Sequence, residues 1–286
     1  MLTTSSHPPD LGHSWQAMLG EVTKQGAFEL LDTYYDLGGN FIDTANSYHS
    51  GESEEWLGEW LESTGRREEM VIATKYSMNS KVGQSVQKSN FGGTGTKSMN
   101  NAISDSLKRL RTEYVDIVRG IPAITRSAGS SLLTVWLQLF VHVWDYATGI
   151  PELMQSLNNL VAQGKVLYLG VSNTPAWVVV KANAYARQHG LRPFSVYQGA
   201  YSAQTRDMER EIIPMCADEG MAILAFRVLG GGYFKTPGSV PEEKGRNAAF
   251  TKVGREERVS AVLDKVGARH GVPLTSVALA YAMQKV

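Results

Sequence analysis

The chain has 286 residues, 43% of them hydrophobic, which is enough to bury a large core in one barrel-sized domain or two small ones. Lysine plus arginine and aspartate plus glutamate number 28 each, so the composition argues against affinity for nucleic acid or an acidic membrane surface. The single cysteine, Cys216, excludes an internal disulfide framework, and its apolar setting predicts a buried helix residue rather than a reactive thiol. The N-terminal residues lack the pattern of a secretory signal, and a cytoplasmic location is therefore predicted.

Short apolar runs alternate with amphipathic segments along the chain. Helices are predicted over 28–38, 52–64, 100–110, 151–163, 175–189, 207–219 and 274–284, and strands over 40–43, 70–75, 114–117, 165–170, 194–198 and 221–226. This repetition predicts a parallel sheet covered by helices, in one domain spanning residues 1–286. Because polar residues recur where strands end, the favoured α/β architecture is a (β/α)8 TIM barrel.

Three polar side chains follow the ends of two successive strands. Asp43 and Tyr48 lie in the segment Asp-Thr-Ala-Asn-Ser-Tyr, and Lys75 ends the apolar run 71–75. A phenol beside an amine that a carboxylate orients is a plausible proton donor. A histidine on the next strand would complete the set, and His142 lies in the apolar run 139–144, although 21 residues later than expected.

Several motifs in the same order resemble those of the aldo-keto reductases. They lie at 38–48, 53–58, 73–75, 107–116, 164–173 and 229–232. The chain is most similar to the fungal aryl-alcohol dehydrogenase and norsolorinic acid reductase branch, which is linked to polyketide and mycotoxin pathways in secondary metabolism. The resemblance covers residues 11–117 and 139–286.

The resemblance implies an NADP(H)-dependent oxidoreductase that reduces aldehyde or ketone groups of aryl or polyketide-type substrates, or oxidises aryl alcohols in reverse. Tyr48 would give a proton to the carbonyl oxygen while the Lys75 cation stabilises the phenolate that remains. Asp43 would orient the amine, and His142 would hydrogen-bond the carbonyl. Taken singly, these residues could equally be a helix cap, a surface tyrosine, a solvated lysine and a structural histidine.

The resemblance also implies cofactor-binding positions. The carboxamide of nicotinamide would be held by Ser172, Asn173 and Gln198, the ring would stack on Tyr201, and the pyrophosphate loop would include Leu229, Gly231 and Lys235. Read without the resemblance, the glycines at 230–232 are a flexible turn. A small carbonyl or alcohol substrate is the expected partner, no metal is expected, and the oligomeric state stays open.

The chain departs from this pattern at three places. Residues 118–138 interrupt a strand that is continuous in relatives, and no segment is expected to supply the first or eighth barrel strand, so the barrel is predicted to be incomplete. Valine codons begin with GT and one glutamine codon ends in AG, so the insertion Val118 to Gln138 has the ends of a retained intron. The alternative function is therefore a catalytically impaired or regulatory cofactor-binding product of a truncated or intron-retaining gene.

Two other features have competing interpretations. The segment 92–98, Gly-Gly-Thr-Gly-Thr-Lys-Ser, is similar to a P-loop, but Gly95 and Lys97 are not adjacent, and a polar loop is favoured over a nucleotide hydrolase site. Trp144 and Tyr146 follow His142 and could form an aromatic wall for a planar substrate or pack under the next helix.

Overall fold

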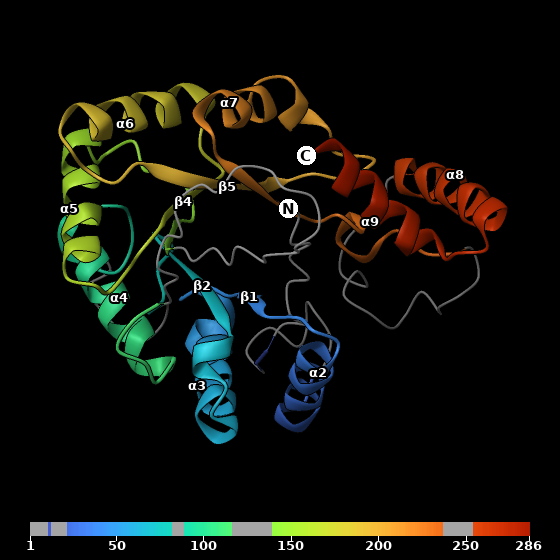
Figure 1. The fold of residues 1–286 in the computed structure, drawn as a ribbon, viewed down its shortest axis with the longest axis horizontal. Coiled ribbons are helices and arrows are strands. Elements are labelled where there is room, and N and C mark those ends of the chain that lie inside the picture. Colours follow the sequence, from blue (N-terminus) through green and yellow to red (C-terminus); the bar gives the residue numbers. More distant parts are fainter. Residues whose placement is uncertain (1–10, 13–21, 82–88, 116–138, 237–253) are drawn as a thin grey trace, which may run out of the picture.

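Six parallel strands form one curled sheet in the part of the chain described by the computed structural model, which comprises residues 11–12, 22–81, 89–115, 139–236 and 254–286 (Figure 1). The strands are β1 Phe41–Asp43, β2 Val71–Tyr76, β3 Leu139–Val141, β4 Leu169–Ser172, β5 Phe194–Ala200 and β6 Ala222–Phe226. Their order in the sheet follows their order in the sequence. The curled sheet with helices on its outer side is that of a half-barrel and confirms the predicted barrel class.

Helices follow the strands as the alternating pattern predicts. They are α2 Lys24–Asp36, α3 Glu52–Thr64, α4 Thr96–Arg109, α5 Ile150–Ala162, α6 Ala176–Gln188, α7 Ile212–Glu219, α8 Arg255–His270 and α9 Leu274–Lys285. Short 3-10 turns lie at η1 Tyr48–Gly51, η2 Arg67–Glu69, η3 Asp207–Glu209 and η4 Gly230–Gly232. The sequence did not predict α8, whose charged segment buries Ser260, Leu263 and Gly267 and so has only a narrow apolar face.

The strand predicted at 114–117 is wrong for its described residues. Tyr114 and Val115 form a bend, and residues 116 and 117 lie outside the described part of the chain. The position between β2 and β4 is taken by β3, which pairs Leu139 with Thr74 on one side and with Leu169 on the other. A run of β-favouring residues does not reveal which of two nearby apolar segments will pair, because pairing depends on distant strands.

The two faces of the sheet have different neighbours. Ala73, Phe140, Val196 and Leu224 form a small cluster inside the curl, with Phe41 and Ala222 against it. Gly170 on β4 makes room for the Phe140 ring, because a Cβ there would lie 2.5 Å from a ring carbon. The outer face packs against the helices through the main core, which includes Trp56 and Ile72.

Candidate active site

The candidate active site is the next layer of side chains above the inner cluster. Successive strand residues point to opposite faces, so a residue two positions beyond an inner residue faces the same way. The residues in this position are Asp43, Lys75, His142, Ser172, Gln198 and Phe226. They lie at the carboxyl ends of parallel strands, where barrel enzymes place their chemistry. The sequence predicted all of these residues except Phe226.

Lys75 is the centre of this layer. Its side chain is 1% exposed, and its Nζ donates to Asp43 Oδ2 at 2.6 Å and to the Thr44 carbonyl oxygen at 2.7 Å. A third contact joins Nζ to the Tyr48 hydroxyl oxygen at 3.4 Å. A buried ammonium needs such partners, because burial without them strongly disfavours its charge. The structure therefore brings the phenol, the amine and the carboxylate together.

The electrostatics of the pair favour a charged amine. Burial lowers the pKa of Lys75, but the Asp43 carboxylate and the Tyr48 hydroxyl together raise it by more. The pKa of Lys75 consequently lies above its ordinary value. A charged amine beside the Tyr48 hydroxyl would stabilise a phenolate there.

His142 lies beside Tyr48 despite its displacement in the sequence. The two rings meet edge to face with centroids 5.9 Å apart. The His142 backbone N–H donates to the Tyr76 carbonyl oxygen at 3.0 Å, which extends the β2–β3 ladder by one residue. Its own carbonyl accepts from Asn173 Nδ2 at 3.2 Å, so the ends of β2, β3 and β4 are joined at the site.

The three predicted carboxamide-binding residues lie on neighbouring strand ends. Ser172 pairs with Gln198 in the β4–β5 register, and Asn173 follows directly in a left-handed conformation with φ 47°. Asn173 Nδ2 also contacts Ser172 Oγ at 3.0 Å. Within the described residues, Gln198 Nε2 is buried without a hydrogen-bond partner. Such an orphaned donor is costly, and it fits an amide oxygen of a ligand.

Tyr201 and the glycine loop lie next to this edge. The Tyr201 ring is buried and stacked on Tyr281, with centroids 6.3 Å apart, and its hydroxyl donates to Glu209 at 2.7 Å. The stacking of nicotinamide on Tyr201 stays a prediction. Because Tyr281 covers one face of the Tyr201 ring, nicotinamide would have to stack on the other face.

The predicted phosphate loop coincides with η4. Leu229 precedes it, Gly231 has φ 68° in its centre, and Lys235 is exposed just beyond it. Three successive glycines with positive φ allow a backbone turn that other residues would resist. This geometry fits the predicted close approach of backbone to phosphate without testing it.

Comparison with known proteins now adds to this geometry. A model of the aldo/keto reductase family matches residues 10–119 and 137–286. The chain belongs to this family. It is 58% identical over 275 residues to an aryl-alcohol dehydrogenase of Pestalotiopsis microspora, which covers 96% of the chain and 66% of that protein.

Two further relatives are named for different activities. Norsolorinic acid reductase B of Aspergillus parasiticus is 48% identical over 274 residues, covering 94% of this chain and 66% of that protein. An NADP(+) aryl-alcohol dehydrogenase of Phanerodontia chrysosporium is 45% identical over 290 residues, covering 96% and 70%. This aldo/keto reductase therefore spans about two thirds of the length of these relatives.

Sequence reasoning missed two contributors to the candidate site. Phe226 is the last residue of β6, is half-buried, and occupies the same layer as Gln198. Its position at a strand end is the signal that could have found it. The Thr44 carbonyl, which accepts from Lys75, is a backbone atom and leaves no signal in the side-chain pattern.

The segment that is similar to a P-loop has its own anionic partners. The Thr94 N–H donates to Asp145 Oδ2 at 3.1 Å, and the Thr96 N–H donates to Glu152 Oε1 at 3.2 Å. Carboxylates thus occupy the positions that phosphate oxygens would take in a phosphate-binding loop. The favoured interpretation as a polar loop fits this arrangement in the aldo/keto reductase.

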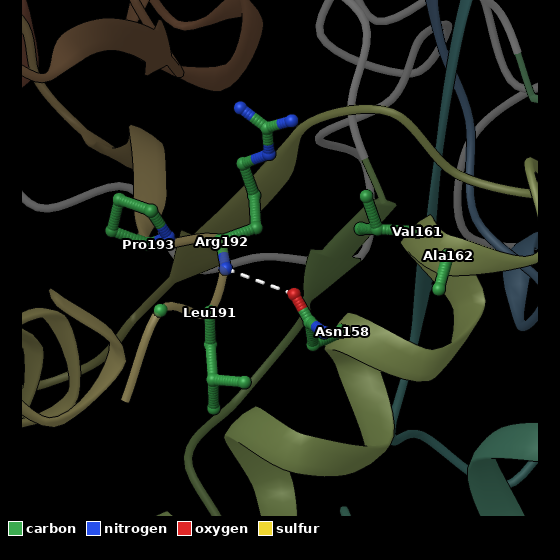
Figure 2. A pocket seen from close by; sticks show the side chains of 7 residues that line it. Asn158, Val161, Ala162, Leu191, Arg192 and Pro193 are labelled. Atoms are coloured by element: carbon green, nitrogen blue, oxygen red, sulfur yellow. Dashed lines mark hydrogen bonds between the residues drawn. The ribbon is translucent and has the colours of Figure 1, made fainter. Parts of the chain in front are cut away.

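A separate hollow of about 340 Å³ lies between the end of α5 and the segment that precedes β5 (Figure 2). It is lined by Asn158, Val161, Ala162, Gly190, Leu191, Arg192 and Pro193. These residues end α5 or precede β5, so the hollow lies at the amino-terminal edge of the strands. Asn158 Oδ1 accepts from the Arg192 backbone N–H at 3.0 Å, and the lining carries no acid–base group aligned with a nucleophile.

The described residues contain neither a metal-binding group of side chains nor a helix fit to span a membrane. No group of three or more His, Cys, Asp or Glu side chains in those residues is arranged to hold a metal ion. None of the helices in the same ranges has the length and apolar character to cross a membrane.

Proposed function

We propose that this chain is an NADPH-dependent oxidoreductase that reduces aldehyde or ketone groups of aryl or polyketide-type substrates and oxidises aryl alcohols in reverse. The observation that carries the proposal is the contact of Lys75 Nζ with both Asp43 and the Tyr48 hydroxyl inside a buried layer. Relatives named for aryl-alcohol oxidation and norsolorinic acid reduction support the substrate class. A role in fungal secondary metabolism such as mycotoxin biosynthesis, and a cytoplasmic location, belong to the same proposal.

Tyr48 acts as the general acid in this proposal. A carbonyl that accepts hydride develops negative charge on oxygen, and a phenol within reach lowers the barrier by giving a proton. Lys75 stabilises the resulting phenolate, and Asp43 holds the amine in place at 2.6 Å. His142, edge to face with Tyr48, would hydrogen-bond the carbonyl oxygen and orient it.

The residues of the site fit a nicotinamide cofactor. When bound, the nicotinamide supplies or accepts the hydride. The orphaned Nε2 of Gln198 and the neighbouring Ser172 and Asn173 side chains would hold its carboxamide. The glycine turn at Gly231, with Leu229 and Lys235 beside it, would follow the pyrophosphate. The NADP(+) in the name of the Phanerodontia chrysosporium relative supports NADP(H) over NAD(H).

The two aromatic residues after His142 differ in exposure. Trp144 packs partly against the main core, whereas Tyr146 is 74% exposed and meets Trp144 edge to face at 6.3 Å. We expect a planar aryl substrate to stack on the exposed ring of Tyr146, four residues after His142. This arrangement supports the aryl class over small aliphatic carbonyls.

The test is turnover of an aromatic aldehyde by the purified chain, followed by the loss of NADPH absorbance. Tyr48→Phe should lower kcat by about 10²- to 10⁴-fold, because the general acid is removed while the ring is kept. Tyr185→Phe is the matched control, since the Tyr185 hydroxyl only accepts from Gln155 on the outer surface. Wild-type turnover that Tyr48→Phe leaves unchanged would contradict the proposed role.

Cofactor binding separates this proposal from the alternative of a regulatory cofactor-binding protein. Quenching of tryptophan fluorescence on titration with NADPH measures binding without chemistry. Binding accompanied by turnover supports the enzyme. Binding with no turnover of any aryl aldehyde or aryl alcohol, in either direction, supports the regulatory alternative.

A further inference from the structure

The first turn of α3 contains two buried polar side chains that the proposed chemistry does not use. Ser53 is 2% exposed and Glu54 is 0% exposed, although both belong to a short acidic segment that would ordinarily face water. Burying a carboxylate is costly unless it is paired and hydrogen-bonded. The partners of these two residues therefore indicate what the burial achieves.

Ser53 is tied to the end of β1. Its hydroxyl is 3.0 Å from Thr44 Oγ1, in a fully buried contact. The Thr44 backbone N–H donates to the Ala73 carbonyl oxygen at 2.8 Å, and the Thr44 carbonyl accepts from Lys75 Nζ at 2.7 Å. The residue that Ser53 holds is thus itself one of the oxygen partners of the catalytic amine.

Glu54 is tied to the end of β2. Its Oε1 accepts from Thr74 Oγ1 at 2.5 Å, and its Oε2 accepts from Arg109 Nε at 2.8 Å, with Arg109 Nη2 2.7 Å away. Thr74 precedes Lys75, so its side chain faces the helices while that of Lys75 faces the site. Fixing Thr74 from outside consequently fixes the backbone from which Lys75 extends inward.

A close approach of two helices makes the Glu54–Arg109 pair possible. Gly58, one turn after Glu54, faces the carboxyl end of α4, where a Cβ would lie 2.2 Å from the Arg109 carbonyl oxygen. Figure 1 shows α3 and α4 side by side on the outside of the sheet. Because Arg109 balances the Glu54 charge, the effect of the pair on the site is one of position rather than net charge.

We propose that Ser53 and Glu54 are positioning residues that hold the ends of β1 and β2 so that Lys75 stays within reach of both Asp43 and Tyr48. The proposal rests on the proposed function for its catalytic consequence. The contact most sensitive to the position of Lys75 is the longest of the three described above, 3.4 Å from Nζ to the Tyr48 hydroxyl oxygen. A small retreat of Lys75 would break that contact first, because an N···O separation beyond about 3.5 Å is no longer a hydrogen bond.

The test uses two uncharged substitutions, Ser53→Ala and Thr74→Val, which remove one hydroxyl each and leave every ionisable group in place. Matched controls are Ser63→Ala and Thr64→Val, because both hydroxyls donate to the Trp60 carbonyl oxygen at the far end of α3. Kcat, the Kd for NADPH, the thermal midpoint and the pH profile of kcat are measured for all four variants and the wild type.

Positioning predicts a specific pattern. Ser53→Ala and Thr74→Val should lower kcat by about tenfold or more with the Kd for NADPH unchanged, since misplacement of a catalytic group costs far more than the lost contact. With the cation further away, the phenol of Tyr48 becomes harder to ionise, so the fall of carbonyl reduction at alkaline pH should move to higher pH. The controls should leave kcat and the profile where they are in the wild type.

Two outcomes overturn the proposal. One is a lower thermal midpoint with kcat and the pH profile unchanged at a temperature where the variants are folded, which is the signature of a purely structural contact. If the wild type shows no turnover, the proposed function fails. The positioning of Lys75 is then tested by measuring its pKa in an NMR titration of ¹³C-labelled lysine, in which the Lys75 signal is identified by its loss in Lys75→Arg. The Lys75 pKa should then be lower in Thr74→Val than in the wild type, and an unchanged value is the second overturning result.

Discussion

Deletion of residues 118–138 is expected to stabilise the protein, and the reason lies in the hydrogen bonds on either side of the segment. The Val115 N–H donates to the Lys165 carbonyl oxygen at 3.2 Å, and the Leu139 N–H donates to the Tyr168 carbonyl oxygen at 3.2 Å. Lys165 and Tyr168 are three residues apart. Val115 and Leu139 become three residues apart only when 118–138 is left out, so the spacing of the two donors then matches the spacing of their two acceptors.

The pairing with β2 and the family comparison also support an interruption of β3 by residues 118–138. Leu139 pairs with Thr74 of β2, so without the segment Ile117 would fall opposite Ala73 and Asp116 opposite Ile72. The match to the aldo/keto reductase family also stops at residue 119 and resumes at 137. The predicted insertion itself lies outside the described residues, and its role as an interruption of β3 is a proposal.

The magnitude follows from loop closure. If the 21 residues make no native contacts, closing that length of chain costs about 3 kcal/mol by the logarithmic dependence of chain entropy on chain length. Removing that cost should raise the free energy of unfolding by a similar amount, about 2–3 kcal/mol, and the thermal midpoint by roughly 5–10 °C. Paired backbone groups of residues 116 and 117 would add to this gain.

Urea unfolding followed by far-UV circular dichroism measures the change. The control replaces 118–138 with a glycine–serine linker of equal length, which keeps the number of residues and removes their sequence, and should unfold at the same urea concentration as the natural chain. A deletion variant that unfolds at lower urea, or a linker variant that is clearly less stable than the natural chain, would refute the reasoning, because the segment would then contribute native contacts of its own.

Three further predictions concern single residues. Lys75→Met should lower the free energy of unfolding by about 3–5 kcal/mol at pH 7, because it leaves the Asp43 carboxylate buried without its counter-charge. The pKa of Lys75 is raised in the folded protein, so this loss of stability, measured by urea midpoints, should persist up to the pKa of an unfolded lysine, about 10.4. It should shrink only as the pH rises through the pKa of Lys75 in the folded protein. Gly58→Ala, which in a free helix would stabilise by about 1 kcal/mol, should instead destabilise by about 1–3 kcal/mol in calorimetry because of the Arg109 carbonyl; an increase in stability would show that the helices are further apart. Burial raises the pKa of Cys216 to about 12, so a thiol reagent at pH 8 should label it only in urea, and rapid labelling of the folded protein would contradict its buried position.

The sequence indicated which side chains would meet at the candidate site where a polar residue directly follows or ends an apolar strand. Asp43 and Lys75 each end an apolar run, and a run of that kind has few places to lie except in a buried parallel strand. Their meeting within 2.6 Å then follows from the parallel pairing of β1 and β2. His142 could be found in the same way, because Leu139 to Val141 is itself a short apolar run.

The sequence was uninformative where burial depends on distant partners. An acidic first turn such as that of α3 is typical of a solvated helix start, and nothing nearby reveals that Glu54 meets Arg109, 55 positions along the chain. The strand predicted at 114–117 was wrong for a related reason, since pairing depends on β2 and β4, which lie elsewhere in the sequence.

The alternation of side chains between the two faces of a strand explains which residues could be recognised from the sequence and which could not. On β2 the inward residues Ala73 and Lys75 belong to the interior and the site, and the outward Thr74 belongs to α3. Inward residues can be recognised from sequence because their chemistry is unusual in an apolar run, whereas outward residues such as Thr74 look ordinary there. If Glu54 positions Lys75 through Thr74 as proposed, then part of what determines this site lies on the outer face of the sheet, which a search for catalytic residues does not consider.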